Sequence, residues 1–208
     1  MIYELLNRYP VLENCKEDME NAANAMIDCY KKGGKLLICG NGGSCADCDH
    51  IVGELMKGFL KQRPLSDAKK AEMKRNCDLA DDALLNKLQG GLPAIALPSM
   101  PALNTAFCND VDPELVYAQS LLALAKENDI LIAISTSGNA KNVFGAVKVA
   151  KALGVTVIGL TGKTGGKLKT AADICICAPE TETFKIQELH LPIYHYLCAA
   201  VEDYFFRI

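Results

Sequence analysis

The stretch DILIAISTSGN, residues 129–139, joins an apolar run to a loop of three hydroxyl residues, a glycine and an asparagine. The run 129–134 is apolar after its first residue and does not alternate with polar residues, as is typical of a strand buried on both faces. A helical pattern over 143–154 and a second apolar run over 155–160 follow. This order of strand, loop, helix and strand predicts an α/β protein with a parallel sheet covered by helices.

The same pattern extends along the chain in both directions. Apolar runs predict further strands at 35–39, 92–97 and 173–178. Apolar spacing and helix-forming composition predict helices at 3–8, 12–32, from 44 to about 60, 66–89, 114–127 and 183–206. Three prolines between 98 and 113 predict a turn-rich region around CND at 108–110. Because no linker or repeat interrupts the pattern, we expect one domain over 1–208, with long helices at both ends.

Composition narrows the classes of function. The 208 residues carry a net charge of −3, which argues against a nucleic-acid binder that relies on bulk positive charge. No apolar run approaches the roughly 20 residues of a membrane span, so we expect neither a nucleic acid nor a membrane as partner. Several of the ten cysteines lie in apolar runs, and the N-terminus lacks the pattern of a signal peptide. These features predict free thiols and a cytoplasmic location.

Two loops that follow strands have the composition of a phosphate site. Ser135, Thr136, Ser137 and Gly138 precede a helix, whose first N–H groups and positive dipole end favour an anion. A helix cap without a ligand is the alternative, although one hydroxyl is enough for a cap. The loop GNGGS at 40–44 matches neither the dinucleotide motif GxGxxG nor a P-loop. A small phosphorylated ligand lying across both loops, beyond the carboxyl ends of the strands, fits better than a nucleotide.

Histidines and acids lie on two of the predicted helices. His50 and Glu54 are four residues apart and share a helix face. Gln187 and His195, eight residues apart on the last helix, lie within one quadrant of it. This pattern suits a metal or a proton-transfer pair, whereas His190 is interpreted as a packed core residue. The CADC motif at 45–48 has no second copy, which argues against a cysteine zinc site.

Several motifs, in order, resemble the sugar isomerase (SIS) domain family, and most closely its phosphoheptose isomerase branch. These motifs are CGNGGS, His50-x-x-x-Glu54-Leu, PAIAL, Asn109-Asp110, ISTSGNAKNV, IGLTGKTGGKL and IQELHLPIYH. The resemblance implies a flavodoxin-like three-layer αβα sandwich in a homotetramer, with sites between subunits. It implies isomerisation of sedoheptulose 7-phosphate, or of another phosphosugar, through an enediol. Non-catalytic phosphosugar-binding relatives, of the type that regulates replication initiation, lack the full His/Glu set and are the alternative.

The resemblance also implies residue roles. Glu54 and His195 match the acid/base pair of the family. The positions implied to bind phosphate and sugar are Asn41, Gly42, Gly43, Ser44, Ser99, Asn109, Asp110, Ser135, Thr136, Ser137, Asn139 and Gln187. The positions that hold zinc in some members are His50, Glu54, Gln187 and His195. Because a lone pair bound to zinc cannot act as a free base, the two roles compete.

This chain departs from the family pattern in the walls of the implied site. Ala140, Phe184, Gly58 and Ser99 stand where the family has Ser, Asp, Arg and Asp, and Lys57 could replace the missing Arg. A segment of about 25 residues, 66–90, is inserted after the helix that carries Glu54. It could form a lid, extend a subunit interface, or stand as a solvated helical hairpin.

Overall fold

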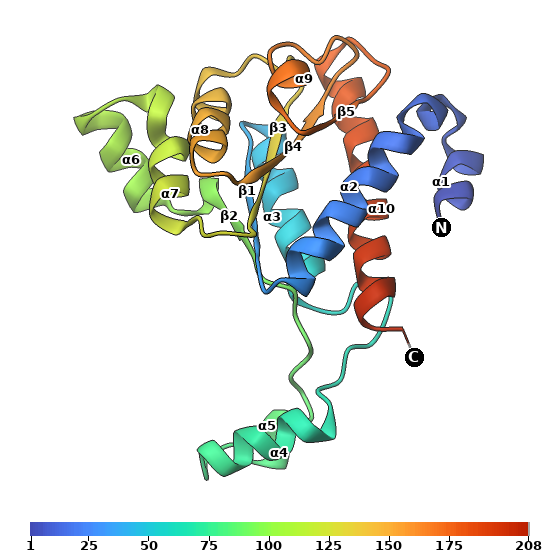
Figure 1. The fold of residues 1–208 in the computed structure, drawn as a ribbon, viewed down its shortest axis with the longest axis vertical. Coiled ribbons are helices and arrows are strands. Elements are labelled where there is room, and N and C mark those ends of the chain that lie inside the picture. Colours follow the sequence, from blue (N-terminus) through green and yellow to red (C-terminus); the bar gives the residue numbers. More distant parts are fainter. Residues whose placement is uncertain (208) are drawn as a thin grey trace.

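The computed structural model describes residues 1–207, which form one five-stranded parallel sheet with helices on both faces (Figure 1). The strands are β1 (Leu36–Cys39), β2 (Ala94–Ala96), β3 (Ile130–Ser135), β4 (Thr156–Thr161) and β5 (Ile174–Cys177). Their spatial order, β2-β1-β3-β4-β5, is the doubly wound order of flavodoxin-like folds. The predicted α/β class with a central parallel sheet is confirmed.

Helices form the two outer layers. They are α1 (Ile2–Arg8), α2 (Lys16–Lys31), α3 (Gly43–Met56), α4 (Asp67–Asn76), α5 (Asp82–Leu85), α6 (Pro101–Asp110), α7 (Val116–Leu124), α8 (Lys141–Ala152), α9 (Leu168–Ala171) and α10 (Thr183–Phe205). Short 3₁₀ turns are η1 (Pro10–Cys15), η2 (Leu97–Ser99) and η3 (Pro113–Leu115). Within residues 1–207, no helix combines the length and apolar character needed to cross a bilayer.

Alternate residues of the buried strands supply two separate cores. Ile132 and Ile158 point into the larger core, under α1, α2, α3 and α10. Leu131 and Val157 point to the opposite side, under α7, α8 and α9. Because both faces of the strands are covered, the strands need no polar alternation, which explains their continuous apolar sequences.

Besides the helix predicted over 66–89, which is divided into α4 and α5, two boundaries differ from the sequence prediction. The proline-rich region expected to be turns contains the helix α6, with Pro101 at its first position, where a missing N–H costs nothing. The helix expected to reach about residue 60 ends at Met56, and the backbone of Lys57 is extended. The first difference matters because α6 carries Asn109 and Asp110 at its C-terminal end.

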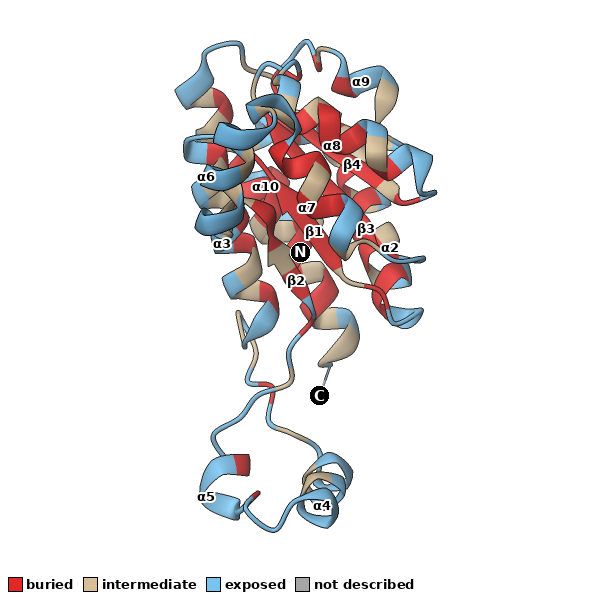
Figure 2. Cartoon of the chain, turned by 90° about the vertical axis from the view of Figure 1, so that its left-hand side faces the viewer, coloured by how far each residue is buried: buried red, intermediate tan, exposed pale blue. Residues whose placement is uncertain are grey.

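The inserted segment forms an arm that projects from the body of the molecule (Figures 1 and 2). Its two ends meet at an antiparallel bridge between Pro64 and Gln89. Ser66 caps α4, since its Oγ accepts a hydrogen bond from the Lys69 N–H. No residue of α4 is buried, and no described residue between 64 and 89 lines either of the two pockets discussed below. The arm therefore does not act as a lid over its own chain in this conformation.

His190 is a core residue, as its sequence context suggests. It is fully buried, and its Nε2–H donates a hydrogen bond to the Thr161 carbonyl at 3.1 Å. Its Nδ1 has no partner among the described residues. Burial lowers the pKa of His190 from 6.5 to about 4, opposed in part by the hydrogen bond to Thr161. The folded chain therefore holds this imidazole neutral.

We expect His190 to make stability fall on acidification. Between pH 6.5 and about 4 the unfolded chain binds a proton at His190 and the folded chain does not, so the free energy of unfolding decreases as pH falls. The loss amounts to about 3 kcal/mol at most, since each pKa unit corresponds to about 1.4 kcal/mol. Urea unfolding of wild type and His190→Gln at pH 7.5, 6 and 5 measures it. The difference between the two should shrink on acidification, and parallel pH profiles would exclude this role.

Candidate active site

A pocket of about 440 Å³ opens where the chain leaves β1 and β3. It is lined by Asn41, Gly42, Gly43, Ser44, Ile134, Ser135, Thr136, Ser137, Ala140, Thr183 and Gln187. The strands β1 and β3 are neighbours from which the chain proceeds to opposite faces of the sheet, and ligands bind at this switch point in open α/β folds. The two loops that the sequence singles out thus face one cavity, and we name it the phosphate pocket.

The second loop of the phosphate pocket leaves a helix N-terminus open to a ligand. Ala140 is the N-cap of α8 and supplies no side-chain cap, so first-turn N–H groups remain for an anion. Ser135 Oγ accepts a hydrogen bond from the Ala140 N–H at 3.4 Å. A tight turn from Ser135 to Gly138, with a 2.9 Å backbone hydrogen bond, directs the hydroxyls of Thr136 and Ser137 toward the cavity wall.

A second glycine-rich loop, 162–166, supports the phosphate loop from behind. The Gly162 N–H donates to the Thr136 carbonyl at 2.9 Å. Gly138 has a φ of +66°, and a Cβ there would overlap the Gly165 carbonyl oxygen. Asn139 joins the two loops, since its Oδ1 accepts from the Lys167 N–H at 3.1 Å. The position of the phosphate loop therefore depends on close backbone packing that a side chain would prevent.

Asn41 belongs to a hydrogen-bonded group that the sequence did not indicate. Its amide pairs with the amide of Asn142 in both directions, at 2.8 and 2.9 Å. Tyr117 donates its hydroxyl to Asn41 Oδ1 at 3.1 Å and to the Gly40 carbonyl at 2.9 Å. Asn142 and Tyr117 lie on α8 and α7, where no local pattern distinguishes them from surface and core positions. They hold the loop after β1 against the loop after β3.

The acid–base residues meet between α3 and α10. His50 Nε2 lies 3.2 Å from Glu54 Oε1, and His50 Nδ1 lies 2.9 Å from the Tyr194 hydroxyl. The ring centroids of His50 and His195 are 5.1 Å apart. Lys57 Nζ lies 3.4 Å from Glu54 Oε2, so both carboxylate oxygens face a nitrogen. The structure thus brings His50, Glu54 and His195 together, whereas no local pattern marks Tyr194 as part of this group.

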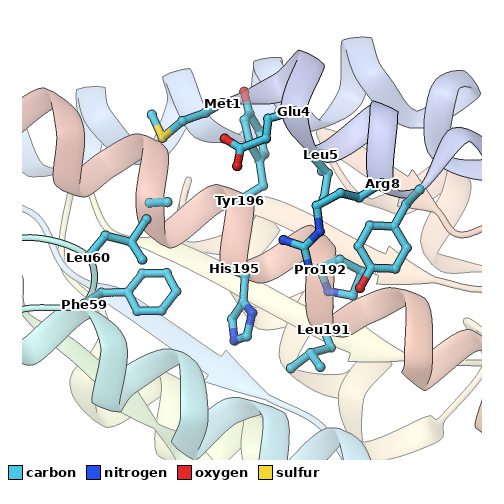
Figure 3. Close-up of a pocket in the computed structure, with 12 residues that line it drawn as sticks. Met1, Glu4, Leu5, Arg8, Phe59, Leu60, Leu191, Pro192, His195 and Tyr196 are labelled. Atoms are coloured by element: carbon cyan, nitrogen blue, oxygen red, sulfur yellow. The ribbon is translucent and has the colours of Figure 1, made fainter.

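His195 occupies a drier environment than a surface histidine. It lines a pocket of about 480 Å³ between α1 and α10, with Phe59 beside its ring at a centroid distance of 5.3 Å (Figure 3). Its Nε2 is buried and has no hydrogen-bond partner among residues 1–207. Burial lowers the pKa of His195, His50 lowers it further, and Glu54 offsets part of the shift. A neutral imidazole with a free nitrogen can exchange a proton or bind a metal.

Gln187 is placed apart from His195. It lines the phosphate pocket, whereas His195 lines the pocket of Figure 3. Eight residues of helix separate their backbones by about 12 Å. Within a single chain, the four positions proposed for zinc thus divide into His50, Glu54 and His195 on one side and Gln187 on the other.

Asn139, His50 and Glu54 line neither pocket, and three further candidates also lie outside both. Ser99 donates its hydroxyl to Asp49, a residue of α3. Asn109 donates to the neighbouring Asp110 carboxylate at 2.8 Å, at the exposed end of α6. None of the three lines the phosphate pocket or the pocket that contains His195.

His50, Glu54 and His195 have the side-chain types of a zinc site but not its arrangement. Two imidazoles and a carboxylate are ligands that zinc prefers, and His195 Nε2 is a buried nitrogen without a partner. However, the described residues contain no group of three or more His, Cys, Asp or Glu side chains arranged to hold an ion. The residue types fit zinc, but these side chains would have to rearrange to bind it.

Comparison with known proteins identifies the class. The chain matches the SIS domain family over residues 4–76 and again over residues 99–199. It is 38% identical over 189 residues to the phosphoheptose isomerase of Aneurinibacillus thermoaerophilus, covering 91% of this chain and 82% of that protein. The parallel sheet, the phosphate pocket and these matches make the chain an SIS-domain protein.

Solved structures give the same result at finer detail. Phosphoheptose isomerase GmhA from Neisseria gonorrhoeae superposes with a TM-score of 0.76 at 30% identity, covering 97% of this chain and 94% of that one. A phosphoheptose isomerase from Francisella tularensis gives 0.75 at 30% identity, with the same coverage. The chain belongs to the phosphoheptose isomerase family.

Proposed function

We propose that this chain interconverts sedoheptulose 7-phosphate and D-glycero-D-manno-heptose 7-phosphate. The observation that carries the proposal is the meeting of Glu54 and His195 around His50, on two helices that also line the phosphate pocket. The phosphoheptose isomerase relatives support the substrate. A regulator that only binds phosphosugars would not need this acid–base group.

The chemistry requires a proton to move between C1 and C2 of the sugar, and a second proton between the two oxygens. Glu54 is held by His50 and Lys57, so its carboxylate is oriented to take the carbon-bound proton and to return it to the neighbouring carbon. His195, neutral in its half-buried pocket, moves the proton on oxygen. The loops that contain Ser44 and Ser135 hold the phosphate and fix the distance of the reacting carbons from Glu54.

Zinc is part of this proposal. His50, Glu54 and His195 would hold the ion in this chain, and Gln187 would reach it only after rearrangement or from a second chain. Because a lone pair bound to zinc cannot act as a free base, Glu54 would take the proton through its second carboxylate oxygen, and His195 would act as a ligand in place of its role in proton transfer. A bound zinc ion supplies polarisation of the substrate carbonyl and stabilises the enediolate charge. The Tyr194 hydroxyl forms a hydrogen bond with His50 Nδ1 and thereby orients the His50 ring. Residues that hydrogen-bond to a zinc ligand commonly have this role.

We expect purified wild-type protein to carry about one zinc ion per chain, and His50→Ala to carry less than a tenth of that. The change removes one nitrogen ligand and leaves the buried His195 nitrogen in place. Mass spectrometry of the desalted protein for metal content measures it. The matched control is His190→Gln, which alters a histidine of the core and should keep its zinc. Equal metal in wild type and His50→Ala, or none in wild type, would contradict the site.

The walls of the site differ from the family pattern, and Lys57 can replace part of what is missing. Phe184 is 56% exposed and presents an aromatic ring in place of an acid. Because residue 58 is glycine, no side chain extends from this position toward the sugar. The Gly58 N–H donates a hydrogen bond to Gln89 Oε1 at 2.7 Å. Lys57, next to Glu54, provides a positive charge close to where the missing arginine would stand. We infer that Lys57 contacts the sugar hydroxyls.

The proposed function is tested by turnover of phosphosugars with five, six and seven carbons, with and without added zinc. The expected result is the highest kcat/KM for sedoheptulose 7-phosphate. A phosphosugar that binds but is not converted would favour the regulatory alternative. Turnover of a shorter sugar alone would keep the isomerase chemistry and change the substrate.

We also infer that the chain assembles as a homotetramer, in which a second chain brings its side chains to the open side of the phosphate pocket. The separation of Gln187 and His195 in one chain supports this arrangement. Light scattering after gel filtration tests it against the chain mass of 22.4 kDa. The ten cysteines, all free within the described residues, support a location in the cytoplasm.

A further inference from the structure

Arg63 and Glu202 form a buried ion pair next to the acid–base group. Each is 1% exposed, and Arg63 Nε lies 2.8 Å from Glu202 Oε1. Arg63 follows α3, and Glu202 lies two helical turns after His195 on α10. Two charges removed from water are costly unless their remaining hydrogen-bonding groups are satisfied. The partners that satisfy them indicate what the pair does.

The guanidinium group of Arg63 closes the end of α3. Its Nη1 donates to the Leu55 carbonyl at 2.7 Å, and its Nη2 donates to the Glu54 carbonyl at 3.1 Å. A helix leaves its last carbonyls without partners, and a cation there also interacts favourably with the helix dipole. One of these two carbonyls belongs to the proposed catalytic carboxylate residue itself. The planar arginine therefore holds the backbone of Glu54 directly.

The carboxylate of Glu202 holds the other side of the site. It accepts hydrogen bonds from the N–H groups of Phe59 at 2.8 Å, Leu60 at 2.8 Å and Lys61 at 3.1 Å. Phe59 is the aromatic residue beside His195 (Figure 3). Burial opposes the charge of Glu202, but these backbone hydrogen bonds and Arg63 keep its pKa below the ordinary value. The ionised Glu202 carboxylate thus fixes the loop 59–61, whose residue Phe59 packs against the His195 ring.

The same pair anchors the base of the arm. The Gly90 N–H donates to the Arg63 carbonyl at 2.7 Å, and the Phe206 ring lies 4.6 Å from the guanidinium carbon. Leu92 donates its N–H to the Leu55 carbonyl at 2.9 Å, where the chain returns from the arm. The ends of α3, α10 and the arm therefore meet at Arg63.

We propose that Arg63 and Glu202 are positioning residues that set the placement of Glu54 relative to His195. The inference rests on the proposed isomerase function. Both side chains are at most 1% exposed, so the substrate cannot touch them. Their effect passes through the carbonyl of Glu54 on one side and through Phe59 on the other. Displacement of a reacting group by about 1 Å can lower a rate by about 100-fold.

The test variant is Arg63→Lys, which keeps the positive charge but lacks the fork that reaches Glu202 and both carbonyls. We expect kcat to fall by about 10- to 100-fold, while KM and the inhibition constant of inorganic phosphate stay within about 2-fold. The matched control is Lys31→Met, which breaks an exposed ion pair with Asp28 at 3.3 Å and should keep kcat. A folded Arg63→Lys variant with wild-type kcat, or with phosphate inhibition weakened in parallel, would overturn the proposal.

A second measurement does not depend on turnover. The chain has three histidines, so its imidazole Cε1–H signals can be assigned with single substitutions. We expect Arg63→Lys and Glu202→Gln to shift the His195 signal, because the Phe59 ring moves, and to leave the signal of the distant core residue His190 unchanged. An unchanged His195 signal would overturn the positioning role. Absence of turnover in wild type would instead count against the proposed function alone.

If single changes prevent folding, the double variant Arg63→Met/Glu202→Met resolves the question. Replacing both members of a buried pair by apolar side chains is often neutral for stability. The positioning role predicts a folded protein whose kcat remains low, since the α3 carbonyls and the 59–61 N–H groups have lost their partners. Recovery of both stability and kcat in the double variant would leave the pair with a purely structural role.

Discussion

Replacing Glu54 by glutamine is expected to lower kcat for sedoheptulose 7-phosphate by about 10²- to 10⁴-fold, the usual contribution of a general base. Glutamine keeps the shape of the side chain and one of its two acceptor oxygens but cannot take a proton. The phosphate pocket lies away from the substitution, so KM and inhibition by inorganic phosphate should change little. Steady-state kinetics with the heptose phosphate as substrate measures both quantities.

Two comparisons make this result specific. Glu188→Gln removes an exposed carboxylate from α10 and should keep the wild-type kcat. Zinc content must be measured in the Glu54→Gln protein, because loss of a metal ligand and loss of a base both lower kcat. A variant that keeps zinc and still turns over at more than a tenth of the wild-type rate would show that Glu54 is not the base.

Replacing Gly138 by alanine is the second change with a large expected effect. The φ of +66° places an alanine in the left-handed region, and its Cβ would overlap the Gly165 carbonyl. Strain and overpacking together should destabilise the fold by about 2–4 kcal/mol. Because the loop must move away from 162–166, we also expect inhibition by inorganic phosphate to weaken by at least about 10-fold. Urea unfolding and inhibition kinetics measure the two effects.

Gly154 provides the matched control for this change. It has a φ of +71°, but a Cβ there would meet nothing within 4 Å. It follows the C-terminal end of α8, the helix whose N-terminus forms the phosphate pocket. Gly154→Ala should therefore cost only the backbone strain, about 1 kcal/mol, and leave phosphate inhibition unchanged. Similar phosphate affinity in Gly138→Ala and wild type would contradict the proposed role of the loop.

The sheet and the phosphate pocket could be predicted because local patterns define them. The five strands are continuous apolar runs, and their loops share one edge of any parallel sheet. The meeting of Ser44 and Ser135 in one cavity follows from that topology alone. The i,i+4 spacing likewise predicted that His50 and Glu54 are adjacent, and His50 Nε2 lies 3.2 Å from Glu54 Oε1.

The rest depends on contacts between distant parts of the chain. Arg63 and Glu202 are 139 residues apart, and neither lies in a pattern that marks a buried charge. Helix α6 was missed because its prolines suggested turns, although Pro101 at a first helical position is compatible with a helix. The direction of the arm could not be predicted, since α4 buries no residue and its charged sequence does not specify a packing face.

The most direct test of the central claim follows sedoheptulose 7-phosphate with the wild-type protein in D₂O by proton and phosphorus NMR. The account predicts a second sugar phosphate, the aldose. It carries solvent deuterium at C2 in those turnovers in which Glu54 exchanges the abstracted proton with solvent before returning it. The Glu54→Gln protein should form the aldose at least about 100-fold more slowly. Unchanged sedoheptulose 7-phosphate with wild type, or aldose formed by Glu54→Gln at the wild-type rate, would contradict the account.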